Sequence, residues 1–199
     1  MFTGIVQSLG SINTIDKDTN IYTIKTNLNL QNCNNGSSIC CDGVCLTAFN
    51  IVKLNEFYLF NVNVGEETLN RSNLIHWHKN TIINLEQSLR IGDEISGHFV
   101  YGHVDTFIKI KKINKLSKSW EFLFLFNNFN NIKKMIVEKG SVTINGVSLT
   151  VSNVLIDCFS VSIIPYTFEN TNLSSLHEND FVNIEFDPLA RYISKYYEK

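Results

Sequence analysis

Residues 41–52 read CDGVCLTAFNIV, and residues 144–155 read INGVSLTVSNVL. Both stretches contain the pattern [DN]-G-V-[CS]-L-T, so the chain carries the same unusual segment twice, about a hundred residues apart. Internal repetition of this kind predicts an architecture made of related units. In each copy the glycine marks a tight turn that needs a positive φ, or lets the backbone approach a neighbour or a ligand closely.

The residues after each turn alternate as in a β-strand, where successive side chains point to opposite faces. This alternation places Cys45 and Thr47 on one face of the first strand, and Ser148 and Thr150 on the matching face of the second. The valine and leucine of each copy point the other way and are predicted to fill a core. The face that carries the polar side chains is therefore a candidate binding surface.

Further pairs of segments recur in the two halves of the chain. They keep the same order and similar offsets: ETLNRSNL (67–74) with YTFENTNL (166–173), MFTGIV (1–6) with FVYGHV (99–104), and, more weakly, IGDEI (91–95) with ENDFV (178–182). Four matches in one order are hard to obtain by chance. We therefore predict two homologous modules, residues 1–97 and 98–187, followed by a helix over residues 188–199.

Alternating apolar and polar residues, rich in β-branched and aromatic types, dominate both halves. The segments that read as strands are NIYTIKTNL, EFYLFNVNV, TFIKIKKI, SWEFLFLF, SVTINGVSLTVSNV, CFSVSII and FVNIEF. Helical signals are limited mainly to NNIKKMIVEKG, ending near Gly140, and to PLARYISKYYEK, which starts with proline. About six strands per module suit a small closed barrel, which leaves no exposed sheet edge. The sequence predicts a mainly β protein with two homologous six-stranded Greek-key β-barrels plus a C-terminal α-helix.

Composition restricts the partners of the protein. The 199 residues carry a formal net charge of −2 and the lysines are scattered, so no nucleic-acid partner is predicted. No apolar run is long enough for a membrane span and MFTGIVQ lacks the features of a secretory signal, so we expect a cytoplasmic protein with no membrane partner. Cys41 and Cys45 have no second ligand pair at zinc-like spacing, so we expect free thiols and no metal.

Five longer motifs together resemble one known family. They are MFTGIVQ (1–7), LEQSLRIGDEISGHFVYGHVD (85–105), INGVSLT (144–150), IPYTFENTNL (164–173) and VNIEFDP (182–188). In order and over essentially the whole chain, they are similar to the α-type riboflavin synthases, whose barrels are lumazine-binding repeats. The resemblance implies a homotrimer held by the C-terminal helix, with sites between subunits. It also implies a dismutation without cofactor or metal: a four-carbon unit moves between two molecules of 6,7-dimethyl-8-ribityllumazine, giving riboflavin and a ribitylaminopyrimidine.

The same resemblance implies ligand contacts in both barrels. For the second barrel the matching residues are Gly102, His103, Val104, Ser148, Leu149, Thr150, Ser162, Ile163, Ile164, Pro165, Tyr166 and Thr167, joined by Gly4, Ile5 and Val6 of a neighbouring subunit. For the first barrel they are Cys45, Leu46, Thr47, Asn63, Val64, Gly65, Glu66, Glu67 and Thr68, joined by Lys139 of a neighbouring subunit. Phe2 and Thr3 belong to the segment that the family folds over the site, with strand packing as the alternative. Lys139 is alternatively a cation at a helix end.

The implied chemistry needs a base that removes a proton from an acidic ring methyl group, and a nucleophile that adds to the donor ring. His103 is a candidate for the base because imidazole titrates near neutrality; the alternative is a hydrogen-bonded strand histidine. His98 lies five residues earlier. On a regular strand it would point to the opposite face, so it is expected to be structural.

Five more residues are candidates for catalysis, and all but Ser38 have a structural alternative. Cys45 is a thiolate nucleophile, a polar contact to the ligand, or an inert buried thiol. Ser148 and Thr150 stabilise developing charge or position a water molecule, or they are ordinary strand hydroxyls. Ser38 matches a family serine near the site. Asp187 orients a partner or acts as a base, or it caps the terminal helix.

Two rival functions remain open. A noncatalytic lumazine- or flavin-binding antenna protein tends to lose one site, whereas this chain keeps G-V-[CS]-L-T and T-[LF]-x-x-[ST]-N-L in both copies. A flavin-binding barrel of an oxidoreductase normally comes with a nicotinamide-binding domain, and no GxGxxG motif occurs. Asn145, Val44 and Tyr101 depart from residues common in the family without removing an assigned role. The difference between Cys45 and Ser148 is a hypothesis for how one ligand becomes donor and the other acceptor.

Overall fold

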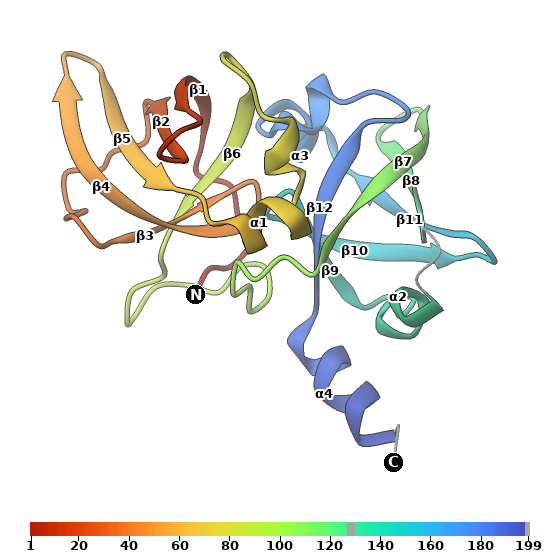
Figure 1. The fold of residues 1–199 in the computed structure, drawn as a ribbon. Helices are drawn as coiled ribbons and strands as arrows, with labels where there is room; N and C mark the ends of the chain where they lie inside the picture. The colour runs from red at the N-terminus through yellow and green to blue at the C-terminus, as the bar shows by residue number, and fades with distance from the viewer. Residues whose placement is uncertain (127–129, 198–199) are drawn as a thin grey trace.

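Six antiparallel strands close the first barrel of the computed structural model, which describes residues 1–126 and 130–197 (Figure 1). The strands are β1 (Ser8–Asp16), β2 (Ile21–Thr26), β3 (Ser38–Cys41), β4 (Val44–Leu54), β5 (Phe57–Asn63) and β6 (Ile82–Gln87). They follow one another around the barrel as β1-β2-β5-β4-β3-β6. This order is that of a Greek key, because the chain passes from β2 to β3 across the barrel and returns through β4 and β5.

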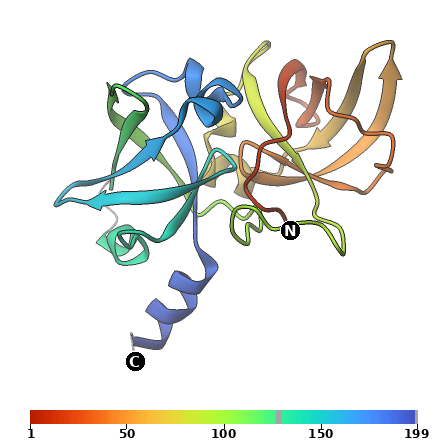
Figure 2. The same cartoon turned by 180° about the vertical axis from the view of Figure 1, so that it is seen from behind.

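The second barrel repeats the first strand for strand. Its strands are β7 (Thr106–Lys115), β8 (Trp120–Leu125), β9 (Ser141–Ile144), β10 (Val147–Val154), β11 (Cys158–Ile163) and β12 (Phe181–Phe186). They close in the order β7-β8-β11-β10-β9-β12, which is the order of the first barrel with six added to each number. The two barrels lie side by side, as the view from behind also shows (Figure 2). The predicted fold class is confirmed.

The helices are short and lie between the strands or after them. In the first barrel α1 (Glu66–Arg71) and the 3₁₀-helix η1 (Asn73–His76) follow β5; in the second, α3 (Pro165–Glu169) and η2 (Asn172–Ser175) follow β11. The others are α2 (Asn130–Met135) and α4 (Pro188–Tyr197). The helix predicted to reach Gly140 ends at Met135, and the chain turns at Lys139, which has a φ of +66°. No helix in the described ranges is long and apolar enough to cross a membrane.

Each barrel has its own apolar core, as the alternation in the sequence predicts. Fully buried side chains of the first include Ile12, Ile24, Phe60 and Leu85, and those of the second include Ile108, Phe124, Val161 and Ile184. Complete burial of one such side chain contributes about 1.5–3 kcal/mol to stability. The opposite faces of the same strands remain available for contacts with the other barrel and for ligands.

The repeated Asp-Gly and Asn-Gly turns meet where the two barrels touch. Asp42 and Gly43 have φ angles of +46° and +85°, and Asn145 and Gly146 have +46° and +78°. Two consecutive positive φ angles define the two-residue hairpin turn that matches strand twist. A Cβ atom on Gly43 would lie 2.9 Å from the backbone nitrogen of Gly146, and one on Gly146 would lie 2.8 Å from that of Gly43. Glycine is therefore required at both turns, because the turns pack backbone against backbone.

Two asparagines surround this contact with nearly symmetric hydrogen bonds. The backbone N–H of Asn84 donates to Asp42 Oδ1 at 2.7 Å, and that of Asn183 donates to Asn145 Oδ1 at 2.8 Å. The side-chain amide of Asn84 donates to the backbone carbonyl oxygen of Asn145 in the other barrel at 2.8 Å. In the same way, the side-chain amide of Asn183 donates to the backbone carbonyl oxygen of Asp42 at 2.8 Å. The last strand of each barrel, β6 or β12, is thus tied to both turns.

The short helices reinforce the junction by crossing from one barrel to the other. The backbone N–H of Asn73, in η1 of the first barrel, donates to Asn183 Oδ1 at 2.6 Å. The equivalent N–H of Asn172, in η2 of the second barrel, donates to Asn84 Oδ1 at 2.7 Å. The match between residues 67–74 and 166–173 therefore reflects equivalent positions in space.

The weak match between IGDEI (91–95) and ENDFV (178–182) is wrong. Residues 91–95 follow β6 in the connection between the barrels, whereas residues 178–182 lead into β12. The structural counterpart of Asn179 is Asn80, since both have a positive φ, 76° and 71°, just before the last strand of their barrel. The turn before β12 corresponds to the turn before β6, not to the connection that follows β6.

Asp42 breaks the symmetry of the junction, since its counterpart is Asn145. Asp42 is 2% exposed, and burial raises the pKa of its carboxyl to about 8. The neighbouring Oδ1 atom of Asn73 is buried and accepts no hydrogen bond from any described residue. On the other side the equivalent Asn172 Oδ1 accepts from the amides of Asn84 and Asn145. Asp42 makes no hydrogen bond to Asn73 Oδ1, whereas an asparagine at position 42 would offer it an N–H.

We predict that Asp42→Asn stabilises the protein increasingly as pH rises from about 4 to about 8. The folded state binds the Asp42 proton more tightly than the unfolded state, so its stabilising effect is complete below the unfolded pKa and is lost as pH rises through the folded pKa. The difference in free energy of unfolding should grow by at most about 1.4 kcal/mol per pH unit in this window. Urea unfolding at several pH values measures it.

The matched control is Asn145→Asp, which adds a second buried carboxyl at the equivalent turn. It should reduce the free energy of unfolding, and more so at pH 8 than at pH 5, because the new carboxyl is desolvated in the same way. Identical pH dependence of wild type and Asp42→Asn would show that the carboxyl is not held protonated in the folded state.

Candidate functional site

Two extended segments each leave their own half of the chain and pack against the repeated strand of the other barrel. The backbone N–H of Ser148, on β10, donates to the carbonyl oxygen of Gly4 at 2.8 Å. The N–H of Cys45, on β4, donates to the carbonyl oxygen of Gly102, also at 2.8 Å. Val6 packs against the core of the second barrel and Val104 against that of the first. The match between residues 1–6 and 99–104 thus describes an exchange of segments.

This exchange corrects the grouping of site residues. Gly102, His103 and Val104 were assigned to the ligand of the second barrel, but they lie on the first. Together they form part of a cavity of about 170 Å³ that is also lined by Val44, Cys45, Glu67, Thr68, Arg71 and Ser72. The contact between Gly4 and Ser148 is made within one chain, so it does not require the segment of a neighbouring subunit.

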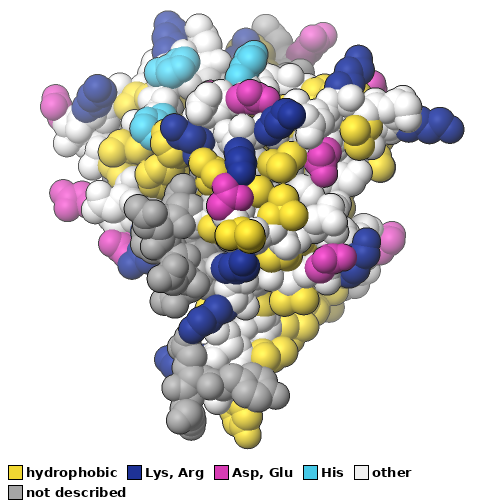
Figure 3. Space-filling view, turned by 90° about the vertical axis from the view of Figure 1, so that its right-hand side faces the viewer, with side chains coloured by type: hydrophobic (Ala, Val, Ile, Leu, Met, Phe, Trp, Pro, Cys, Tyr) yellow, Lys and Arg dark blue, Asp and Glu magenta, His cyan; other side chains and the backbone are white. Residues whose placement is uncertain are grey.

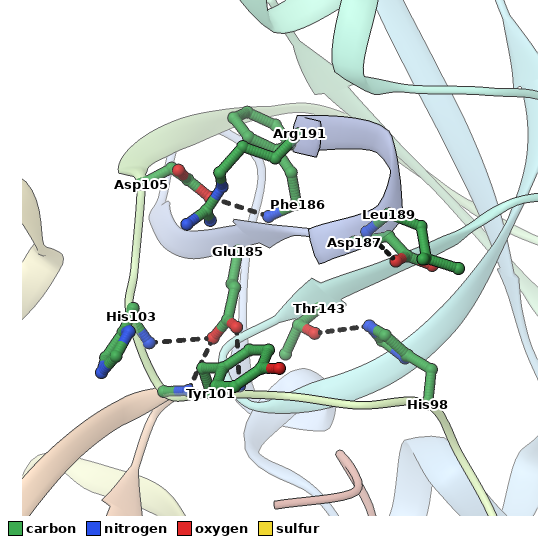
Figure 4. A network of polar contacts seen from close by, with 11 residues as sticks. His98, Tyr101, His103, Asp105, Thr143, Glu185, Phe186, Asp187, Leu189 and Arg191 are labelled. Atoms are coloured by element: carbon green, nitrogen blue, oxygen red, sulfur yellow. Dashed lines mark hydrogen bonds and ion pairs between the residues drawn. The ribbon is translucent and has the colours of Figure 1, made fainter. Parts of the chain in front are cut away.

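Two buried glutamates hold the exchanged segments in place. Glu86 on β6 accepts hydrogen bonds from the backbone N–H groups of Thr3 and Gly4, at 2.7 and 3.0 Å, and from the Thr3 hydroxyl at 2.9 Å. Glu185 on β12 accepts from the N–H groups of Tyr101, Gly102 and His103 at 2.7–3.0 Å (Figure 4). Burial raises the pKa of both carboxyls, and these hydrogen bonds oppose the rise.

Neither glutamate was among the predicted site residues. A signal for them exists: INLEQ at 83–87 and VNIEF at 182–186 share N-[LI]-E in equivalent strands. Each glutamate therefore stands two residues after the asparagine of the barrel junction. One strand in each barrel fixes both the inter-barrel contact and the segment that covers the site.

Phe2 and Val100 join the exchanged segments to each other. Their backbones form an antiparallel bridge, with Phe2 N–H donating to the Val100 carbonyl at 2.7 Å and Val100 N–H donating back at 3.0 Å. Both side chains are fully buried and form a small cluster with Cys40, against which Cys45 packs. Phe2 therefore belongs to the buried cluster against which Cys45 packs. Thr3 instead holds the N-terminal segment through its hydrogen bonds to Glu86.

The two faces of the repeated strands are as the alternation predicts. Cys45 and Ser148 are half-buried, and Thr47 and Thr150 are exposed on the same faces. The residues between them lie in the barrel cores; Leu46 and Leu149 are 5% and 7% exposed. These two leucines can reach a ligand only through their backbone groups. Ser38 on β3 lies opposite Thr47, and Cys40 lies opposite Cys45.

The segments after β5 and β11 occupy equivalent places beside these strands. Within 63–68 and 162–167, Val64 and Ile163 are buried in the cores, so they do not offer side chains to a ligand. Thr68 on α1 lines the cavity with Cys45. Lys139 is exposed and stands after the end of α2, so the alternative of a cation at the helix end is wrong. The site assigned to Lys139 on a neighbouring subunit stays a prediction.

The histidines differ from expectation. His103 is exposed, lines the cavity of the first barrel and stacks on Tyr101 with ring centroids 6.0 Å apart. His98 was expected to point away, but its Nδ1 lies 2.7 Å from the hydroxyl oxygen of Ser148. The argument from strand alternation fails here because residues 97–105 form no regular strand, only the bridge at Val100.

Asp187 caps the C-terminal helix, which was the structural alternative to a catalytic role. Its Oδ1 accepts a hydrogen bond from the backbone N–H of Leu189 at 2.9 Å, at the start of α4 (Figure 4). Within residues 1–126 and 130–197, no three histidine, cysteine, aspartate or glutamate side chains are grouped as metal ligands. The five cysteines are all free thiols.

Comparison with known proteins agrees with this geometry. The model of the lumazine binding domain matches residues 3–88 and again residues 101–187, one match for each barrel. Riboflavin synthase of Actinobacillus pleuropneumoniae is 36% identical over 98% of this chain and 89% of that protein. Riboflavin synthase of Brucella abortus is 35% identical, with 98% and 97% covered, and that of Bacillus subtilis is 33% identical, with 100% and 91% covered.

The chain belongs to the riboflavin synthase family. Solved structures of a protein named LumP share the fold of this family member at much lower identity. LumP complexed with riboflavin has a TM-score of 0.79 at 20% identity and covers 94% of this chain and 100% of that one. LumP complexed with 6,7-dimethyl-8-(1'-D-ribityl) lumazine has a TM-score of 0.77 at 19% identity, with 93% and 98% covered.

The packing of this riboflavin synthase homologue predicts that Gly102→Ala is far more damaging than substitution of an unconfined glycine. Gly102 has a φ of +74°, and a Cβ atom there would lie 2.6 Å from the Cβ of Cys45. Overpacking of this kind costs about 1–3 kcal/mol beyond the strain of the positive φ. Thermal and urea unfolding should show this additional loss.

Gly92→Ala is the matched control, since Gly92 has a φ of +97° and no atom within 4 Å of the added Cβ. It reports the cost of the backbone strain alone, about 1–2 kcal/mol. Equal destabilisation by the two substitutions would mean that the segment at Gly102 is not pressed against β4 in solution.

Proposed function

We propose that this chain is a riboflavin synthase that converts two molecules of 6,7-dimethyl-8-ribityllumazine into riboflavin and 5-amino-6-ribitylaminopyrimidinedione. One observation carries the proposal: β4 and β10, which hold the repeated segment and are called the ligand strands below, are equivalent in the two barrels. Each ligand strand is covered by a segment that a buried glutamate holds. A dismutation uses one compound in two roles, so it needs two similar sites that are not identical. The reaction is a transfer of a four-carbon unit, and it is the last step of riboflavin biosynthesis.

The proposed chemistry depends on bringing two bound lumazine rings together. Well-oriented reactants can gain about 7–11 kcal/mol in barrier over free encounter in water. Backbone groups of the repeated strands suit the amide-like edge of the heterocycle, and the hydroxyls of Thr47 and Thr150 suit the ribityl chain. His103 is the proposed base in the first site, because its exposed ring lines the cavity beside Cys45 and Thr68.

A noncatalytic antenna protein is the second candidate, and the similarity to LumP in fold is the observation that favours it. The fold alone does not decide between the two functions. The equivalence of the two sites favours the enzyme, because a chromophore carrier gains nothing from a second ligand strand covered in the same way. Relatives named riboflavin synthase cover nearly the whole chain at 33–36% identity, which also favours the enzyme.

The proposed assembly is a homotrimer with catalytic sites between subunits, formed in the cytoplasm. The support lies in α4, which projects from the second barrel (Figure 1) and exposes Leu189, Tyr192 and Ile193 at 70%, 77% and 57%. In the space-filling view, hydrophobic side chains gather toward the projecting lower end of the molecule, where α4 lies (Figure 3). The helix is anchored by Arg191, whose guanidinium pairs with Asp105 at 2.9 Å. An exposed apolar stripe on an anchored helix is a surface for association.

We predict that the purified protein, given 6,7-dimethyl-8-ribityllumazine alone, forms one riboflavin for every two lumazine molecules consumed. Chromatography with absorbance detection follows both compounds and the pyrimidine product. Bound lumazine without any riboflavin would establish the antenna function instead. Denatured protein and buffer alone are the controls, since they report uncatalysed turnover.

We predict that replacing Leu189 and Ile193 by serine gives monomers with little activity. The apolar contacts of α4 are lost, while the Arg191–Asp105 pair that anchors the helix is kept. Lys195→Ser, which replaces an exposed charged side chain on the same helix and removes no apolar surface, is the matched control and should remain assembled. Light scattering measures the mass. A fully active monomer would contradict the proposal that sites are shared between subunits.

A further inference from the structure

A histidine lies between two hydroxyl groups beside the second barrel's ligand strand. His98 Nδ1 is 2.7 Å from the hydroxyl oxygen of Ser148 on β10. Its Nε2 is 3.1 Å from the hydroxyl oxygen of Thr143 on β9, the contact that Figure 4 marks. Ser148 and Thr143 are direct partners in the antiparallel pair of these strands. The imidazole thus connects the side chain of the ligand strand to a buried hydroxyl behind it.

The backbone around His98 is built for this position. The His98 N–H donates to the carbonyl oxygen of Thr3 at 3.1 Å. A Cβ atom on Gly97 would lie 2.0 Å from that same oxygen and 2.9 Å from the Cβ of Ser148. Only glycine allows the chain to run so close to both. The exchanged N-terminal segment and the ligand strand therefore fix the ring from two sides.

The surroundings of the ring favour its neutral form. Burial lowers the pKa of His98, and the negative charge of Asp187 opposes this only in part. Glu185 also stands nearby, on β12 opposite Thr143, while Thr143 and Ser148 themselves carry no charge. A neutral imidazole donates from one nitrogen and accepts at the other. The two hydroxyls must therefore take complementary directions, one giving its proton to the ring and the other receiving one.

The first barrel has no such arrangement. Thiols occupy the two equivalent positions: Cys45 stands where the second barrel has Ser148, and Cys40 stands opposite it in the strand pair. Cys45 packs against the apolar cluster of Cys40, Phe2 and Val100. Among the described residues, no histidine nitrogen hydrogen-bonds to its thiol. The difference between the barrels thus extends beyond a single residue to the group that orients it.

We propose that His98 is a positioning residue that fixes the hydroxyl of Ser148 toward the ligand of the second barrel, and so makes that site chemically different from the first. This rests on the proposed function, and it names a device by which two identical lumazine molecules receive different roles. A thiol packed in an apolar cluster faces one ligand. An oriented hydroxyl, held by a neutral imidazole, faces the other.

The decisive comparison uses two substitutions at the same position. His98→Asn places an amide near the position of Nδ1 and keeps the hydrogen bond to Ser148, whereas His98→Gln extends toward Nε2 and keeps only the bond to Thr143. We expect His98→Asn to retain kcat within about three-fold and His98→Gln to lose roughly ten-fold, as expected for one hydrogen bond. Thermal midpoints of the two variants should agree. Equal kcat in both variants would overturn the proposal.

A double-mutant cycle tests whether His98 acts through Ser148. On a Ser148→Ala background, His98→Gln should cause no further loss of kcat, because the hydroxyl to be oriented is absent. Independent, multiplying losses would overturn the proposal. The pH profile of kcat gives a third readout: protonation turns both ring nitrogens into donors, so the acid limb of wild type that reports His98 should be missing in His98→Asn.

A separate assay of the wild-type protein shows whether the proposed function itself is wrong. Wild-type protein that forms no riboflavin from 6,7-dimethyl-8-ribityllumazine refutes the enzyme assignment whatever the variants do. The positioning role is then decided by titrating the same variants with the lumazine and following its fluorescence. Weaker binding by His98→Gln than by His98→Asn, absent on the Ser148→Ala background, supports the role; equal binding overturns it.

Discussion

The contact between two glycine turns is the constraint on which the rest of the molecule depends. Gly43 and Gly146 meet backbone to backbone, at a separation that leaves no room for a side chain on either. Asn84 and Asn183 then bind both turns at once and close a buried ring of hydrogen bonds. Buried polar groups are stable only when satisfied. The relative placement of the barrels is therefore sharply defined.

The junction that fixes the two barrels relative to each other also positions the buried glutamates and the segments that they hold. Glu86 and Glu185 follow the two junction asparagines by two residues in their strands, so each carboxylate stands at a fixed distance from the contact. Each collects the backbone N–H groups of the segment that leaves its own half of the chain and covers a strand of the other barrel. The covered ligand strands are thus a consequence of the junction. Loss of the junction would loosen both sites together.

Near symmetry and its exceptions have different physical consequences. The symmetric parts, which are the barrels, the turns and the clamped segments, give the two halves of the chain equivalent surfaces. The exceptions fall into two groups. Asp42, opposite Asn145, costs stability near neutral pH because a buried carboxyl must stay protonated. Cys45, opposite Ser148 with its histidine, gives the two repeated strands different side chains at the same position.

Much of this could be predicted from the sequence, because repetition and alternation are local. The repeated D/N-G-V-[CS]-L-T segment predicted the two units and the faces of β4 and β10, and its glycines predicted the turns. Of the site residues that the resemblance implied, Glu67, Thr68 and residues 102–104 line one cavity with Cys45, and Gly4 contacts Ser148. The grouping of Gly102, His103 and Val104 was wrong, since no local pattern tells which barrel an extended segment will cover.

The sequence by itself determined the class of fold and the equivalence of the two halves, because strand periodicity and turn chemistry act over a few residues. Only the tertiary structure decided the exchange of segments, the clamping by the buried glutamates and the meeting of His98 with Ser148. These contacts join residues 50 to more than 80 positions apart. They arise from how two closed barrels pack, and outside regular strands a side chain's direction cannot be counted from its neighbours.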